Sequence, residues 1–382
     1  MDYLINKRYA DHRHGTGVQL KLFADQFEQK PLHVCWDDGQ GVKDTYEPVC
    51  NLNTSILRKW PLGRGRGLVA NLETKLGRVW EEQSKISKRV KKFSRARTGK
   101  SRAYVIIASE AEAKTARQVL GAVKADYVVN VMDYLHLETK GAGEFPEFAA
   151  LLKDAKKIFA LTPPIQSVLS QMSGRRDIAT LGVAREPARK KSCACIPGAN
   201  TFQIVMMGSV DYQRGLAELD KFCKGLEATG IKYCLNYIGT EEMRSRLGAH
   251  LSVNYRGVRL GAEREAMLDT MHLAYLPGPD GHPDEDYLAR FSFPSRLTDY
   301  FWHGLPVIGP LFETSATAQM LADLQGKGIW FSHDAKQLVN VAKNLAQKPK
   351  EWETASEAVY SFAQQHFSMT RCAKTIMEAF NS

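Results

Sequence analysis

Short apolar runs alternate along the chain with amphipathic stretches of helical period. In the first half, the apolar runs predict strands at about residues 2–7, 31–37, 102–109, 126–134, 156–162 and 178–184. The stretches of helical period predict helices at 18–29, 112–123, 145–155 and 163–173. Strands and helices that take turns in this way are typical of a parallel sheet covered on both faces.

The alternation stops over residues 185–200 and then begins again. This stretch, REPARKKSCACIPGAN, is rich in charged, proline and small residues and is interpreted as a linker. Beyond it, strands are predicted at 201–208, 232–239, 253–257, 272–277, 305–309 and 328–331, helices at 215–229 and 293–304, and helical structure from Asp334 onward. The sequence therefore predicts two α/β domains, spanning residues 1–184 and 201–360, followed by a last helix over 361–382.

Residues 58–102 interrupt the first domain with a basic amphipathic insertion. Apolar residues recur there at spacings of three, four and seven, as on one face of a long helix. The segment holds 15 Lys and Arg against 3 Asp and Glu, whereas the rest of the chain holds 37 against 39. Such a helix suits an anionic membrane surface. It equally suits packing against its own domain with the charges in water, and both interpretations stay open here.

Bulk properties set wider limits on the protein. A chain of 382 residues exceeds the usual size of one hydrophobic core, which favours two domains. No apolar run approaches the roughly 18 residues that span a bilayer, and the N-terminus has no apolar segment of signal-peptide length. Seven cysteines at scattered spacings agree with a reducing compartment. We therefore expect a cytoplasmic protein.

Glycines stand in the first turn of each predicted domain, between a strand and a helix. They belong to the segments 14–17 (HGTG) and 208–215 (GSVDYQRG), and the second segment also carries Arg214. Glycine lets a phosphate approach the backbone near a helix N-terminus, and arginine pairs with a diphosphate. The ordinary alternative is a tight turn without a ligand. Leu20 occupies the third glycine position of a dinucleotide fingerprint, so the first segment does not match that motif.

The stretch 291–309, FSFPSRLTDYFWHGLPVIG, reads as a helix followed by a buried strand. Ser295 is predicted to cap the helix, and Arg296 places a positive charge at a helix end where the dipole is already positive. This cost is offset if an anion binds there. Asp299, one turn later, is placed to accept hydrogen bonds from sugar hydroxyls. The alternative is an ordinary surface helix with an acid in its first turn.

Three side chains at predicted strand ends of the first domain are candidates for a general base. They are Asp133 and His136 after one strand and His14 in the first loop. A carboxylate or imidazole in a ligand-binding cleft can deprotonate a hydroxyl. A histidine in such a place is also commonly structural.

Taken together, the second half of the chain resembles the donor domain of GT-B-fold glycosyltransferases of the family 4 type. The segments that carry the resemblance are the turn 208–215, the stretch 254–258 (NYRGV) and the line SFPSRLTDYFWHGLPVIG. Relatives often show Pro-Ser-Lys-Leu, an acid before Tyr, and Gly-x-Pro-Val-Ile, so that Arg296 stands here for the usual Lys and Asp299 for the usual Glu. The resemblance implies two doubly wound Rossmann-like domains that face each other across a cleft, with the C-terminal helix returning to the first domain.

The resemblance also implies roles for particular residues. Arg214 and Arg296 would hold the donor diphosphate, Asp299 would bind the ribose, and 256–258 would line the base pocket. The implied donor-binding residues are Gly15, Gly17, Gly208, Ser209, Arg214, Arg256, Val258, Ser295, Arg296, Leu297 and Asp299. The implied donor is a nucleotide-sugar, of UDP or GDP type, and no cofactor or divalent metal is expected, because helix dipoles and basic side chains would neutralise the leaving diphosphate. The implied acceptor is a hydroxyl of a glycan or a lipid-linked glycan in bacterial surface or exopolysaccharide synthesis, with peripheral contact to the inner membrane face through 58–102.

One departure from the family leaves the stereochemistry open. Many retaining members carry Glu-x7-Glu, and Phe291 occupies the place of the first Glu. Asp286 and its acidic neighbours in the preceding loop have the wrong spacing to replace it. Two alternatives to the glycosyltransferase interpretation also remain: a UDP-sugar epimerase on the same fold, and a nucleic-acid-binding protein that uses 58–102. The negative balance elsewhere in the chain argues against the second.

Overall fold

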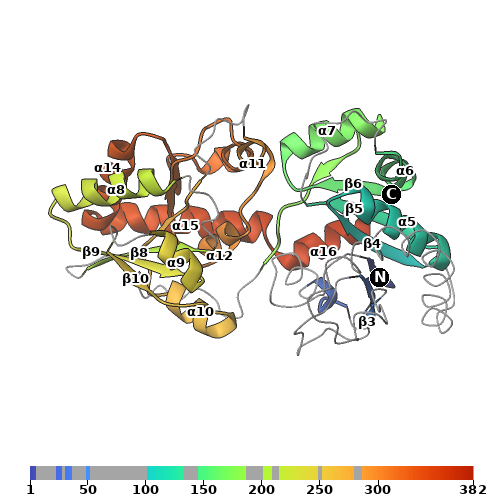
Figure 1. The fold of residues 1–382 in the computed structure, drawn as a ribbon, viewed down its shortest axis with the longest axis horizontal. Coiled ribbons are helices and arrows are strands. Elements are labelled where there is room, and N and C mark those ends of the chain that lie inside the picture. Colours follow the sequence, from blue (N-terminus) through green and yellow to red (C-terminus); the bar gives the residue numbers. More distant parts are fainter. Residues whose placement is uncertain are drawn as a thin grey trace, which may run out of the picture. The chain divides into compact units, whose positions relative to one another are not determined.

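A computed structural model of the chain describes residues 1–5, 23–27, 31–36, 49–51, 101–132, 145–185, 201–208, 215–247, 252–278 and 286–381. The chain divides into two compact units (Figure 1). Unit 1 comprises Met1–Leu161, Ile165–Leu181 and Cys372–Ser382, and unit 2 comprises Thr162–Pro164 and Gly182–Arg371. The predicted basic insertion, up to residue 100, lies outside the described residues.

Unit 1 contains a parallel sheet whose strand order is β3-β2-β1-β4-β5-β6-β7. Its strands are β1 (Tyr3–Ile5), β2 (Leu32–Cys35), β3 (Val49–Asn51), β4 (Arg102–Ile107), β5 (Asp126–Val131), β6 (Lys157–Ala160) and β7 (Ala179–Thr180). Its described helices are α5 (Glu110–Val123), α6 (Pro146–Asp154) and α7 (Pro163–Ser173). Along the chain, strands β1 to β3 follow one another toward one edge of the sheet, and strands β4 to β7 follow one another toward the other edge. This is the doubly wound order of nucleotide-binding folds.

Unit 2 repeats this plan with the order β10-β9-β8-β11-β12-β13, again with parallel pairing. Its strands are β8 (Phe202–Met207), β9 (Tyr233–Ile238), β10 (Val253–Tyr255), β11 (Leu273–Tyr275), β12 (Val307–Gly309) and β13 (Ile329–Phe331). Its first helices are α8 (Leu216–Ala228), α9 (Glu241–Leu247), α10 (Gly261–Leu268), α11 (Tyr287–Phe291), α12 (Arg296–Trp302) and α13 (Ala316–Met320). The direction of winding reverses between β8 and β11.

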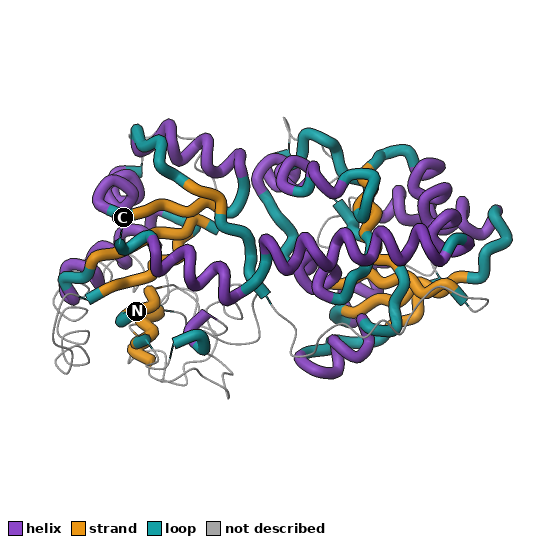
Figure 2. Tube along the Cα trace, turned by 180° about the vertical axis from the view of Figure 1, so that it is seen from behind, coloured by secondary structure: helices purple, strands orange, loops and turns teal. Residues whose placement is uncertain are grey.

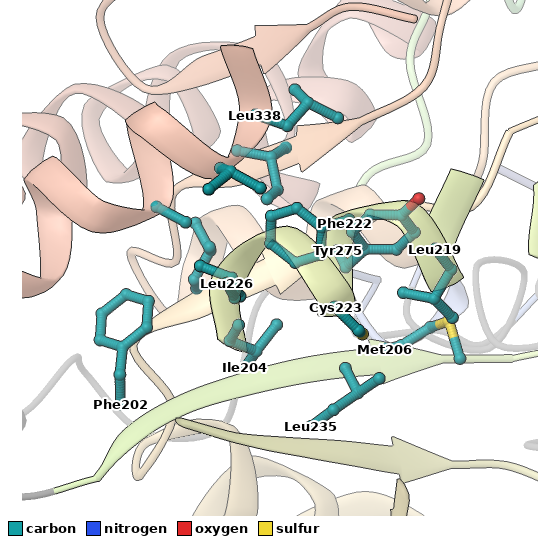
Figure 3. Close-up of a cluster of buried hydrophobic side chains, with 14 of the residues drawn as sticks. Phe202, Ile204, Met206, Leu219, Phe222, Cys223, Leu226, Leu235, Tyr275 and Leu338 are labelled. Atoms are coloured by element: carbon teal, nitrogen blue, oxygen red, sulfur yellow. The ribbon is translucent and has the colours of Figure 1, made fainter. Parts of the chain in front are cut away.

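The core of unit 2 follows from the period-two alternation of β8. Phe202, Ile204 and Met206 point to one face of the sheet, where they meet Leu219 and Phe222 of α8 (Figure 3). Helix α14 (Ala335–Gln347) lies beside α8 on this face and adds a buried apolar row to the same cluster (Figure 1). Burial of this row fixes the register of β8, and with it the position at which the strand ends.

Three consecutive helices close the chain, α14, α15 (Pro349–His366) and α16 (Met369–Glu378), drawn in purple in Figure 2. Helix α15 is fastened to unit 2 by Trp352, whose indole N–H donates to the carbonyl oxygen of His272 at 2.6 Å. It also packs against α12, where the rings of Phe301 and Phe362 meet edge to face at 6.0 Å. In unit 1, the guanidinium of Arg102 lies 5.8 Å from the ring centre of Phe380. Among the described helices, none combines the length and the apolar character needed to cross a bilayer.

The predicted architecture of two doubly wound α/β domains is confirmed, although several short elements were missed. Strand β3 and helices α9, α10, α11 and α13 were not predicted. Helix α9 buries only Met243 and Leu247 in seven residues, which is too short a pattern to show a helical period. Short elements of this kind are stabilised by tertiary packing more than by their own sequence.

The close packing of β12 against β11 gives a first prediction. A Cβ on Gly309 would lie 2.4 Å from the carbonyl oxygen of Leu276, so the backbone would have to move. We expect Gly309→Ala to lower the stability of unit 2 by about 1–3 kcal/mol. Thermal denaturation followed by circular dichroism measures this loss.

Gly121→Ala is the matched control, because Gly121 lies in helix α5 with nothing within 4 Å of an added Cβ. There the same change should stabilise the chain by roughly 0.5–1 kcal/mol through helix propensity. Equal thermal midpoints for the two variants would contradict the packing argument.

Candidate functional site

The carboxyl ends of β8 and β11 form the switch point of unit 2, where ligands bind in open parallel sheets. Strand β11 pairs with β8 only at Ile204 and Val205. Past Val205, the β11 side of β8 has no strand partner in the described residues, and side chains of α12 take its place. The backbone N–H of Met207 donates to the hydroxyl of Tyr300 at 2.9 Å, and the carbonyl oxygen of Met207 accepts from the guanidinium of Arg296.

Gly208 follows Met207 at the end of β8 and has the left-handed backbone that glycine favours, with φ of 87°. Its N–H donates to Ile238 O at 3.0 Å, and its carbonyl oxygen accepts from the hydroxyl of Tyr237 at 2.9 Å. A Cβ at this position would lie 3.2 Å from both Cζ and Nη1 of Arg296. Gly208 therefore lets the guanidinium lie directly against the end of the strand.

Arg296 brings a full positive charge to this switch point. The side chain is half-buried and donates to the neutral carbonyl oxygen of Met207. Burial raises the pKa of the neighbouring Tyr300 hydroxyl, with the charge of Arg296 acting in the opposite direction. The phenol thus stays neutral, and the positive charge beside Gly208 is suited to a phosphate.

The first turn of α12 differs in detail from the prediction. Ser295 stands at the N-cap position and is exposed, but its side chain makes no capping hydrogen bond, and its φ of −57° and ψ of −23° are already helical. The predicted side-chain cap is therefore wrong; the carbonyl of Ser295 instead accepts from the Thr298 hydroxyl at 2.7 Å. Leu297 is among the implied donor-binding residues, and its backbone N–H donates to Pro294 O at 3.0 Å.

Asp299 lies on α12, three residues after Arg296, and is almost completely buried. Arg185 holds both of its oxygens, with Nε 2.8 Å from Oδ1 and Nη1 2.9 Å from Oδ2. Arg264 of α10 adds a second positive charge, its Nη2 being 3.6 Å from Oδ1. Burial raises the pKa of Asp299 to about 6, and the charge of Arg264 opposes this shift. The role of Asp299 in binding a ribose stays a prediction.

The predicted base-binding stretch 256–258 follows β10 directly. Its Arg256 reaches across to β9, with Nε donating to Asn236 Oδ1 at 2.9 Å. Val258 leaves 56% of its surface exposed, and so does Leu260 with 53%, which makes them unusual among the large apolar residues of the described chain. An exposed apolar side chain beside an anchored guanidinium is compatible with a planar base.

The remaining sequence-predicted site residues lie outside the described residues. They are His14, Gly15, Gly17, Asp133, His136, Ser209 and Arg214. Across the parts of the chain that are described, no three His, Cys, Asp or Glu side chains are grouped as metal ligands.

Residues far away in the sequence form hydrogen bonds with α12 and with the loop before it, and sequence reasoning did not predict them. Arg185 was assigned to a linker because it opens a charged, proline-containing stretch. Thr162 donates its hydroxyl to Phe291 O at 3.0 Å, and Thr317 donates to Ser292 O at the same distance. Buried hydroxyl and guanidinium groups need partners, but a single sequence does not show which partners they find.

No protein-family model matches the sequence of this chain, and no curated protein sequence matches it either. The structure is similar to that of HepE from Anabaena in complex with UDP, with a TM-score of 0.67 and 13% identity over 100% of both chains. It is also similar to sucrose-phosphate synthase from Thermosynechococcus elongatus, with a TM-score of 0.67 and 12% identity over 99% of this chain and 98% of that one.

A third similar structure is a glycosyltransferase from Rickettsia africae, with a TM-score of 0.65 and 10% identity over 98% of this chain and 96% of that one. At these identities the likeness establishes the fold. The predicted GT-B fold is therefore confirmed along nearly the whole chain.

The contact between Gly208 and Arg296 generates a second prediction. We expect Gly208→Ala to displace the guanidinium, because the new methyl would lie 3.2 Å from Cζ and Nη1. Positive φ adds a backbone cost of about 1–2 kcal/mol. Gly230→Ala is the matched control, since Gly230 has φ of 75° with nothing within 4 Å of an added Cβ.

Both variants should lose similar thermal stability, whereas Gly208→Ala alone should weaken the binding of inorganic pyrophosphate, measured by calorimetry. If both variants bind pyrophosphate as the wild type does, Gly208 does not position an anion-binding arginine.

Proposed function

We propose that the chain is a glycosyltransferase that moves a sugar from a nucleotide-sugar to an acceptor hydroxyl. The observation that carries this proposal is the placement of Arg296 against Gly208 at the switch point of unit 2. A fixed positive charge at that point suits a nucleoside diphosphate. The likeness to HepE, which has been solved with UDP and with UDP-glucose, supports a donor of this class.

In the proposed reaction an acceptor oxygen forms a bond to the anomeric carbon of the sugar. The bond from that carbon to the diphosphate oxygen breaks, and its electron pair leaves with the nucleoside diphosphate. Arg296, together with Arg214 as predicted from the sequence, stabilises the charge that develops on this leaving group. The proton of the acceptor hydroxyl passes to a base, for which Asp133, His136 and His14 are the candidates.

Residues around α12 bear on the stereochemistry of this reaction. Phe291 is 2% exposed, so an apolar core side chain occupies the place where many retaining relatives have a glutamate. Asp286, in the loop considered as a substitute, accepts from the N–H of Leu288 at 2.9 Å and caps α11. We therefore propose no retaining mechanism that depends on a carboxylate at either position.

Arg296→Ala tests the donor site. Loss of a charge-assisted contact worth about 1.5–3 kcal/mol should lower the rate of transfer at least tenfold. Arg296→Lys should retain much of the rate, because it keeps the charge at the same place. Arg246→Ala is the control, since Arg246 is an exposed partner of Glu242 on α9. Turnover by Arg296→Ala at the wild-type rate would remove Arg296 from the site.

A thermal-shift screen with UDP, GDP, ADP and CMP identifies the nucleotide for that assay. A nucleotide at 100 times its Kd should stabilise the folded chain by about 2.7 kcal/mol. Absence of any shift would contradict the proposed function. Release of the nucleotide with and without an added acceptor separates transfer from epimerisation, because an epimerase needs no acceptor.

We further propose that the acceptor is a glycan or lipid-linked glycan and that 58–102 brings the protein to an anionic membrane surface. The support is the local excess of 15 basic over 3 acidic residues with a helical apolar period. Replacing Lys88, Lys91 and Lys92 by Gln should weaken binding to phosphatidylglycerol vesicles by about 3 kcal/mol, at roughly 1 kcal/mol for each charge. Sedimentation with these vesicles measures the effect, and neutral phosphatidylcholine vesicles are the control. Equal binding of the wild type and the triple variant to the phosphatidylglycerol vesicles would contradict membrane contact.

A further inference from the structure

Arg185, which lies outside helix α12, contacts both carboxylate oxygens of Asp299. Nη1 of Arg185 donates to Oδ2 at 2.9 Å, and Nε lies 2.8 Å from Oδ1, so each carboxylate oxygen has a nitrogen of the same guanidinium beside it. The Asp299 side chain is 10% exposed and that of Arg185 is 21% exposed. Most of the pair is therefore shielded from water, and its geometry is fixed by the surrounding residues.

The backbone of Arg185 is itself anchored. Its N–H donates to Phe367 O at 2.9 Å, at the end of helix α15. Three residues earlier, Gly182 lies against the ring of Phe367, and a Cβ there would be 3.0 Å from Cε1. The backbone of Arg185 is therefore held in place. The side chain of Arg185 then loses little conformational entropy when its guanidinium engages the carboxylate.

Stability alone is a weak reason for such a pair. Removing two charges from water costs free energy, and buried ion pairs often contribute no more than apolar residues of the same size. An arginine that contacts both oxygens of a carboxylate does, however, restrict its orientation and favour its ionised form. Burial acts against ionisation and, although the charge of Arg264 opposes it, raises the pKa of Asp299 to about 6.

The carboxylate still has capacity for further hydrogen bonds. Two ionised oxygens offer about four acceptor positions, and the hydrogen bond from Nη1 of Arg185 uses one of them, on Oδ2. Arg264, at 3.6 Å, is beyond hydrogen-bond distance and contributes charge alone. Helix α12 carries Asp299 one turn after Arg296, so a ligand held by Arg296 lies near the remaining acceptor positions.

We propose that Arg185 is a positioning residue for the ribose of the donor and acts through the carboxylate of Asp299. This inference rests on the proposed function, in which Asp299 accepts hydrogen bonds from the ribose hydroxyls. Arg185 holds the carboxylate in one rotamer and in its ionised form, so that its outer acceptor positions face the ligand before binding. Residues behind a binding site commonly fix the rotamer of a ligand-binding side chain in this way.

The test compares UDP with 2′,3′-dideoxy-UDP, which lacks the two ribose hydroxyls but keeps the base and the diphosphate. Arg185→Met should weaken UDP binding about tenfold and the dideoxy ligand by less than about twofold, within the range of effects that residues outside the ligand contacts exert. Arg185→Lys should restore part of the loss because it returns a charge and one donor. Asp299→Asn should show the same selectivity, and the double variant should be no weaker than the single variants.

Two controls isolate orientation from charge and from folding. Arg264→Met removes a positive charge near the same carboxylate without removing a hydrogen bond, and it should leave the ratio of the two affinities unchanged. Arg246→Met changes an exposed arginine of α9 and should change neither affinity. Calorimetry well below the thermal midpoint of each variant keeps all proteins folded during the measurement.

Each outcome decides the inference. Equal losses for UDP and the dideoxy ligand would mean that Arg185 holds the helix and not the ribose-binding carboxylate, which overturns the proposal. A lowered thermal midpoint with unchanged affinities would assign Arg185 a purely structural part and overturn it as well. A selectivity loss in Arg264→Met equal to that in Arg185→Met would assign the effect to charge and overturn the role of orientation. If wild-type protein binds none of the four nucleotides in the thermal-shift screen, the proposed function fails and the inference fails with it.

Discussion

The backbone N–H and carbonyl oxygen of Met207, the last residue of β8, both form hydrogen bonds with side chains of helix α12. The geometry of the candidate site depends on this contact. Beyond Val205 the neighbouring strand β11 no longer pairs with β8, so the polar groups of Met207 need other partners. Helix α12 supplies them through the hydroxyl of Tyr300 and the guanidinium of Arg296. The same two contacts that satisfy the strand end bring the start of α12 against Gly208. Fold and site are thus joined at one residue, at the point where the winding of the sheet reverses.

The unfavourable position of Arg296 at a helix start has a physical explanation in this arrangement. One donor of its guanidinium is satisfied by a neutral carbonyl, the oxygen of Met207. The dipole of α12 adds partial positive charge at the same end. Asp299, the acid one turn later on the helix, is paired with Arg185. The folded chain therefore brings a guanidinium and a helix N-terminus together at this end of the sheet, a combination that suits an anionic ligand.

The sequence predicted the elements with long apolar patterns and the residues that lie within one motif. The buried strands and the helix of the stretch FSFPSRLTDYFWHG follow from hydrophobic period and from the Pro-Ser and Gly signals at its ends. The bond from Arg185 to Asp299 joins residues 114 positions apart, and the bond from Arg296 to Met207 joins residues 89 apart. Nothing in local spacing indicates such pairs, because they arise when the sheet brings strand ends and helix starts together. Arg185 was therefore placed in a linker, although its side chain belongs to the candidate site.

The residues just before α12 show where the chain departs from the motif of the glycosyltransferases that its sequence resembles. Phe291 occupies the position of a catalytic glutamate in many retaining enzymes, and here it is core. Its carbonyl oxygen is tied to Thr162, and the carbonyl of Ser292 is tied to Thr317, so the loop keeps a fixed path into the helix without a carboxylate. The aromatic side chain adds apolar burial where a charged group would need solvent or a ligand. In the proposed function, donor binding and the stereochemical choice are thereby separated: the former is assigned to Gly208, Arg296 and Asp299, and the latter to groups other than residue 291.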